Sequence, residues 1–248
     1  MLLLNRTTGS SRPPGDPAMT TTPDTTKTPD TTTTPDTTTA PGSTSMEPLA
    51  RLSAAVGVAA TTIDALDPAQ YDRPTPCPPM SVGALAEHLV MALRRVALAG
   101  RDVPLAEWPI DAADVAAGTW GDALRAAGRD VEQAWADPAL LERPTTLPWG
   151  TFPGREVLDV YTNEMVIHTW DLATATDQHP EWDPALLEAS LAVMHAQLPV
   201  PVRAPIWEAV YAGMPAEVPR DIPFADAVDV AEDAPLIDRL VAWNGRTP

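Results

Sequence analysis

A glutamate and a histidine four residues apart have the spacing in this sequence that best suits chemistry. They lie in the segment VLDVYTNEMVIHTWDLATA, residues 157–175, where six residues recur every three or four positions: Val157, Tyr161, Glu164, His168, Leu172 and Ala175. On a helix these residues form one stripe, and such a stripe faces the protein core. Burying an unpaired carboxylate costs free energy, so the inward glutamate needs a partner. We expect that partner to be a bound metal ion.

A third polar residue, His88, occupies an inward position of another predicted helix, among Leu85, Leu89, Ala92 and Val96. Side chains on facing helices of a bundle can build a metal site in the core. Two imidazoles and one carboxylate match the protein ligands of catalytic zinc sites, which keep a fourth position for water or substrate. Mn, Fe and Ni accept the same ligands. Spacing leaves one alternative open, in which both histidines are core residues with backbone partners and Glu164 is an ion-paired carboxylate.

Two further residues could serve the same site. Asp171 follows His168 by three positions, close enough to orient a ligand imidazole or to accept a proton from bound water. A carboxylate on the helix surface is the equal alternative. Cys77 precedes a helix N-terminus, where a thiolate would be favoured, although a buried loop thiol is the simpler interpretation. His179 and His195 lie off the stripe and are interpreted as exposed or structural.

Helical periodicity predicts the elements that must position these residues. Helices are expected over residues 46–66, 81–100, 119–137, 153–176, 183–198, a short stretch around Trp207, and 233–245. Capping and stop residues are predicted at Ser81, Thr119, Asp183, Asp233 and Gly245, and Pro153 is placed in a first helical turn. The only strand candidates are residues 200–202 and 224–230. The expected fold is mainly α, with a four-helix bundle over residues 46–198 and a C-terminal extension over residues 199–248.

The first 45 residues differ from the rest, because they repeat Thr, Pro and Asp with few apolar residues and are expected to be a disordered tail. Met19 and Met46 are alternative start sites. The N-terminus has only three consecutive apolar residues, too few for a secretory signal, and no stretch is long enough to span a membrane. With a single cysteine, the chain is expected to be cytoplasmic. A net charge of −18 disfavours binding to nucleic acid.

Two segments of the chain resemble a known family. TPCPPMSVGALAEHLV, residues 75–90, and NEMVIHTWDLATAT, residues 163–176, are similar to the signature segments of the mycothiol-dependent maleylpyruvate isomerases, which are DinB-like metal-binding four-helix bundles. The closing DAPLIDRLVAWNGRTP is similar to the tail of an uncharacterised actinobacterial branch. The resemblance implies a divalent metal, most often zinc, on His88, Glu164 and His168. It also implies mycothiol as the thiol cofactor.

The chain departs from that family in two places. It reads Cys77-Pro78-Pro79-Met80 where the family usually has Cys-Pro-Gly-Trp, and it has about fifty residues after Pro199 where the isomerase carries a larger α/β domain. We therefore expect a metal-dependent transferase or isomerase that uses a low-molecular-weight thiol on an electrophilic small molecule. The alternative is a non-enzymatic helical protein with a structural ion. The last fifty residues could cover the site or form a homodimer contact.

Overall fold

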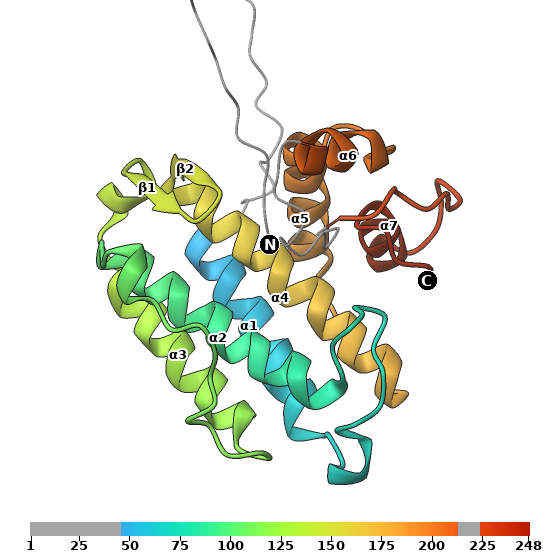
Figure 1. Ribbon diagram of the computed structural model, residues 1–248, viewed down its shortest axis with the longest axis horizontal. Coiled ribbons are helices and arrows are strands. Elements are labelled where there is room, and N and C mark those ends of the chain that lie inside the picture. The colour runs from blue at the N-terminus through green and yellow to red at the C-terminus, as the bar shows by residue number, and fades with distance from the viewer. Residues whose placement is uncertain (1–45, 213–223) are drawn as a thin grey trace, which may run out of the picture. The chain divides into compact units, whose positions relative to one another are not determined.

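Four long helices form the body of the protein in the computed structural model, which describes residues 46–212 and 224–248. They are α1 (Pro48–Asp64), α2 (Val82–Gly100), α3 (Trp120–Ala134) and α4 (Gly154–Thr176). Helix α1 packs against α3 and α4, and α2 also packs against α3 and α4, so the four helices enclose one core (Figure 1). The predicted mainly α fold with a four-helix bundle is confirmed. The predicted tail, residues 1–45, lies outside the described residues.

Helix ends follow the predicted caps at some sites and not at others. The Ser81 hydroxyl accepts the backbone N–H of Ala84 at the start of α2, and Asp183 accepts that of Ala185 at the start of α5 (Pro184–Gln197). Thr119 does not cap α3, because its hydroxyl donates to the Ala116 carbonyl instead. The other correction is at Asp233, which does not cap the last helix. Ala234 precedes Pro235, and a residue before proline disfavours helical geometry. The helix therefore starts after Pro235.

The central helix α4 is buried on almost every side. Seventeen of its 23 residues are buried, because α1, α2, α5 and the C-terminal segment all contact it. Pro153 precedes its first turn instead of lying in it. Gly154 begins the helix where a Cβ atom would lie 2.0 Å from the Leu140 carbonyl oxygen, so no larger residue fits. This position fixes where the helix leaves the preceding hairpin.

A short antiparallel hairpin precedes α4, formed by β1 (Pro144–Leu147) and β2 (Gly150–Pro153). Its register pairs Thr146 with Thr151, whose hydroxyls lie 3.1 Å apart. The two strand candidates, residues 200–202 and 224–230, are not strands, so that prediction is wrong. Both segments are loops in which Val200, Val202 and Val230 are exposed, so their apolar residues do not pack as a strand would. Three 3-10 turns, Pro68–Gln70, Leu105–Glu107 and Pro138–Leu141, complete the connections.

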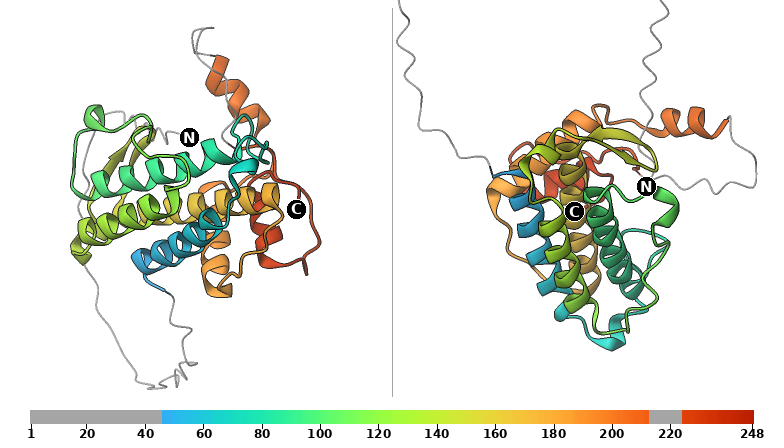
Figure 2. Two further views of the ribbon diagram at one scale, coloured as in Figure 1. Left: turned by 90° about the horizontal axis from the view of Figure 1, so that it is seen from below. Right: turned by 90° about the vertical axis from the view of Figure 1, so that its left-hand side faces the viewer.

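The C-terminal extension contains α6 (Ala204–Ala212) and α7 (Leu236–Trp243), as predicted around Trp207 and at the end of the chain. Helix α7 packs against α5 and contacts α4 (Figure 2). Gly245 ends it with a positive φ of 81°, which favours glycine. The boundary at residue 198 between bundle and extension stays a prediction. Among the described helices, none combines the length and the apolar character that crossing a membrane demands.

Candidate metal centre

Three predicted site residues meet between α2 and α4. The Nε2 atom of His88 lies 2.9 Å from Oε1 of Glu164, and Nε2 of His168 lies 3.4 Å from the same oxygen. The two imidazole rings are 5.2 Å apart at their centroids and nearly perpendicular. Possible ligand atoms of all three residues lie within 4.8 Å of one another. The structure therefore brings together two segments that are 76 residues apart in the chain.

The spacing of these atoms suits a small divalent cation. Ligands at about 2.0–2.2 Å from a tetrahedral zinc ion lie roughly 3.3 Å apart. The 2.9 and 3.4 Å separations around Glu164 are close to that value. Glu164 and His168 are buried and His88 is half-buried, so the group lies at the edge of the core with one side less covered. These three residues could hold a metal ion with little rearrangement.

Asp171 fixes the orientation of one of these imidazoles. Its Oδ2 atom lies 2.9 Å from Nδ1 of His168, and its side chain is fully buried. Because a carboxylate only accepts hydrogen bonds, Nδ1–H donates to it and Nε2 is directed at Glu164. A metal-ligating histidine commonly holds its second nitrogen in this way. The interpretation of Asp171 as a carboxylate on an exposed helix surface is wrong.

The end of the chain supplies a partner that the sequence analysis missed. Arg246, just beyond α7, donates from Nη2 to Asp171 Oδ2 at 3.1 Å and from Nε to Oδ1 at 3.3 Å. The Asn163 amide also donates to Asn244 at 3.2 Å, which holds the same segment against α4. The sequence gives little sign of this contact. A cationic partner would be expected only if Asp171 were known to be buried. The C-terminal extension thus contributes directly to the surroundings of the site.

The buried charges shift one another's pKa. Burial by itself would raise the pKa of Glu164, but His168 and His88 offset it and hold that pKa well below its usual range. Burial by itself would lower the pKa of His168, but Glu164, Asp171 and Cys77 raise it well above the usual value. Together these shifts favour a carboxylate beside a protonated imidazole in the metal-free protein. A cation that binds here must displace that proton.

Cys77 lies beside the site but does not belong to the group of His88, Glu164 and His168. It forms a second possible ligand group with His168 and Asp171, and only His168 is common to both. Asp171 already accepts hydrogen bonds from His168 and Arg246, and the positive charge of Arg246 disfavours a cation there. The group of His88, Glu164 and His168 is therefore the better candidate. His179 and His195 are exposed, as predicted, and His195 packs edge-on against Trp243.

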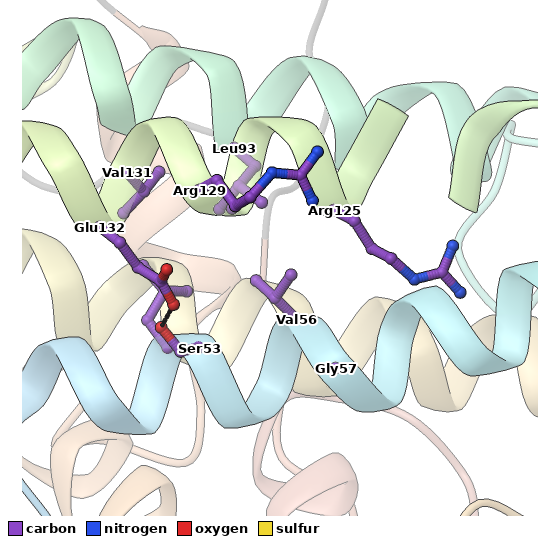
Figure 3. A pocket seen from close by; sticks show the side chains of 10 residues that line it. Ser53, Val56, Gly57, Leu93, Arg125, Arg129, Val131 and Glu132 are labelled. Atoms are coloured by element: carbon purple, nitrogen blue, oxygen red, sulfur yellow. Dashed lines mark hydrogen bonds between the residues drawn. The ribbon is translucent and has the colours of Figure 1, made fainter. Parts of the chain in front are cut away.

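A surface hollow elsewhere on the bundle contains none of the predicted site residues. It lies between α1 and α3 (Figure 3), where the Ser53 hydroxyl donates to Glu132 at 2.8 Å. Arg125 at its rim is paired with Asp64. No histidine or cysteine lines this hollow. Its Ser53 hydroxyl and Glu132 carboxylate are hydrogen-bonded to each other, and no histidine lies beside them to act as a base or a further ligand.

Comparison with known proteins agrees with the resemblance predicted from the sequence. Residues 52–173 match the family described as the mycothiol maleylpyruvate isomerase N-terminal domain, so that prediction is confirmed for this segment. The chain is also 28% identical to two uncharacterised proteins of Mycobacterium tuberculosis, from strains CDC 1551 / Oshkosh and ATCC 25618 / H37Rv. Each match covers 204 residues, or 82% of this chain and 99% of the relative. No solved structure matches the chain.

Proposed function

Because residues 52–173 match the mycothiol maleylpyruvate isomerase N-terminal domain, we propose that this protein is a divalent-metal-dependent enzyme that uses a low-molecular-weight thiol. The geometry that supports this most is the approach of two imidazole Nε2 atoms, at 2.9 and 3.4 Å, to one carboxylate oxygen of Glu164. His88, Glu164 and His168 would hold the metal, and zinc is the first choice for this ligand set. When bound, the cation would act as a Lewis acid that favours the thiolate form of a thiol.

The surrounding residues have roles that follow from their contacts. Asp171 keeps the Nδ1 proton of His168 in place, so Nε2 is directed toward the metal position. Arg246 forms two hydrogen bonds with the fully buried Asp171 and provides a positive charge beside its carboxylate. We assign Asp171 to positioning His168, because both of its oxygens already accept hydrogen bonds.

The reaction class is addition of a thiolate to an electrophilic carbon. Loss of a leaving group after addition gives S-transfer. Rotation about the former double bond, followed by elimination of the thiolate, gives cis–trans isomerisation and returns the thiol unchanged. Mycothiol is the thiol that the family suggests. The cytoplasmic location stays a prediction.

Metal binding is tested by zinc titration of the full chain and of three variants, His88→Ala, Glu164→Ala and His168→Ala. We expect one tightly bound zinc ion in the wild-type protein and loss of that binding in each variant. His179→Ala is the matched control, because His179 is exposed and outside the site. Unchanged stoichiometry and affinity in all three variants would end the proposal.

Thiol use is tested with cobalt(II) in place of zinc. Adding mycothiol should produce a sulfur-to-cobalt charge-transfer band, because the three protein ligands leave a position for the thiol. The Cys77→Ser variant should give the same band, which separates the added thiol from the protein's own. A purely structural ion would give no band with any thiol, and its removal would unfold the bundle without loss of an activity.

A further inference from the structure

Two hydrogen-bond donors near the start of α4 have no acceptor among the described residues. The indole N–H of Trp149, at the tip of the hairpin, has no hydrogen-bond partner among the described residues. Tyr161 is 4% exposed, and no acceptor for its hydroxyl, which is not fully buried, is found in the same described ranges. The two rings lie 6.4 Å apart at their centroids. Buried polar groups are normally paired, so the Trp149 indole calls for an acceptor, and the Tyr161 hydroxyl beside it is free to donate to the same ligand.

Arg95 on α2 brings a positive charge to the same region. Its Nε and Nη2 atoms donate to the Pro109 carbonyl at 2.9 and 2.6 Å, and it has no carboxylate partner in the part of the chain that the structure describes. Its neighbour Arg94 is different, because it forms two hydrogen bonds with Asp114, at 2.7 and 3.0 Å. Arg95 is half-buried, and no carboxylate of the described residues is bonded to it to balance its charge in this acidic chain, as is also the case for Arg143.

These donors lie next to the candidate metal centre. Tyr161 precedes Glu164 by three residues, which places both on one face of α4. Arg95 follows His88 by seven residues, which places both on one face of α2. Burial raises the pKa of the Tyr161 hydroxyl, the charge of Glu164 also raises it, and that of Arg95 lowers it. Tyr161 is therefore near both charged groups, and it remains a protonated donor.

We propose that Arg95, Tyr161 and Trp149 form a subsite that binds a carboxylate group of the electrophilic substrate. All three residues offer donors, and the tryptophan indole and the arginine guanidinium cannot accept, so the complementary group is an anionic oxygen. The planar guanidinium fork suits the two oxygens of a carboxylate. Nearby Glu164 would repel a group of higher charge, such as a phosphate dianion. That this ligand is a substrate rests on the proposed function. That a carboxylate binds to these three residues does not.

The subsite is tested by nuclear magnetic resonance on the full chain labelled with ¹⁵N at its tryptophan indoles, with zinc present, using maleate as the probe. The Trp149 signal is assigned by its loss in Trp149→Phe. Maleate should shift that signal, and the uncharged dimethyl maleate should not. Arg95→Met should weaken maleate binding by about tenfold or more, as expected for loss of a charge-assisted hydrogen bond. Arg94→Met is the matched control and should bind as the wild type does.

A second variant guards against a folding defect in Arg95→Met. Tyr161→Phe keeps the ring and removes only the hydroxyl, and it should weaken maleate binding by about threefold to tenfold. Equal maleate affinity in the wild type and both variants, or no shift of the Trp149 signal, would overturn the subsite. The two proposals fail separately, because a missing subsite leaves the cobalt–thiol band intact. Failure of the thiol proposal leaves the maleate shift intact.

Discussion

The two flanks of the His88–Glu164–His168 group differ in how their polar atoms are satisfied. On the flank toward the end of α4, which we call the closed flank, Asp171 accepts hydrogen bonds from His168 and Arg246 and is fully buried. On the flank toward the start of α4, which we call the donor flank, Trp149 and Tyr161 have donors without an acceptor in the described ranges. Both flanks contain an arginine, but only the closed flank contains a carboxylate bonded to it.

This difference separates positioning from binding. A buried ion pair whose members are both held by the chain fixes the geometry of whatever it touches, and here it touches a candidate metal ligand. Unpaired donors cost free energy in the folded protein, and a ligand that accepts from them recovers part of that cost. The closed flank should therefore govern folding and metal affinity, and the donor flank should govern ligand affinity.

The largest effect is expected from Arg246→Met, which leaves the buried Asp171 with the His168 imidazole as its remaining partner. Removing one partner of a buried pair costs about 3–5 kcal/mol of unfolding free energy. Urea unfolding of the metal-free protein measures it. Arg239→Met is the matched control on α7, since no ion pair of Arg239 is found among the described residues, and it should change stability by less than about 0.5 kcal/mol. A loss below about 1 kcal/mol for Arg246→Met would contradict the role of the closed flank.

Asp171→Asn should have the next largest effect, on metal binding. The substitution keeps the shape of the side chain but removes the charge that holds the Nδ1 proton of His168. Loss of such a partner lowers metal affinity by about 10–100-fold. Competition with a zinc chelator measures the affinity. Asp177→Asn is a suitable control, because Asp177 lies exposed at the C-terminal end of the same helix. Equal zinc affinity in both variants would remove Asp171 from the site.

The sequence predicts the three candidate ligands because each lies on a regular helix. Glu164 and His168 share one helical stripe, and His88 occupies a position between apolar residues, so periodicity alone identifies them. That α2 and α4 face each other is a tertiary fact, which the family resemblance implied and helical spacing could not show. The hairpin was missed because each strand has only four residues and a proline lies at its outer end. Such short runs carry no readable alternation.

Arg246 and the burial of Asp171 could not be predicted from local pattern. Their contact joins positions 75 residues apart, and neither residue breaks the pattern of its own segment. A helix with a polar residue off its apolar stripe is expected to expose that residue. Helix α4 does not follow this rule, because α5 and α7 cover the side that a four-helix bundle would leave open. The extension therefore changes the interpretation of a residue in the bundle.

The pH dependence of the metal-free protein should show the coupling of Glu164 and His168. The raised pKa of His168 contributes stability that is fully present below pH 6.5 and is lost as pH rises through the folded-state value. The lowered pKa of Glu164 contributes stability that is present above pH 4.5 and is lost as pH falls through its folded-state value. The contribution of the pair is thus greatest between these two pH values.

Urea midpoints measured from pH 4 to pH 9 test this coupling, with Glu164→Gln as the comparison. The wild type should lose stability relative to the variant on both sides of that window. Above pH 6.5, where the stability of the metal-free protein falls, zinc affinity should rise with pH. Protons compete with the cation for His168, and fewer are bound at higher pH. A difference between wild type and variant that does not change with pH would show that the two groups do not interact.

The smallest effect on stability is expected from Arg95→Met, the change that bears most directly on the contrast between the flanks. Among the described residues Arg95 donates only to the Pro109 carbonyl, and it is half-buried, so its loss should lower the unfolding free energy by about 1 kcal/mol. Urea unfolding measures this beside Arg246→Met. Adding maleate should stabilise the wild type and leave the Arg95→Met protein nearly unchanged, because only a bound ligand shifts the folding equilibrium. If Arg95→Met instead costs as much as Arg246→Met without any ligand, both arginines are structural, and the donor flank holds the fold together in the same way as the closed flank.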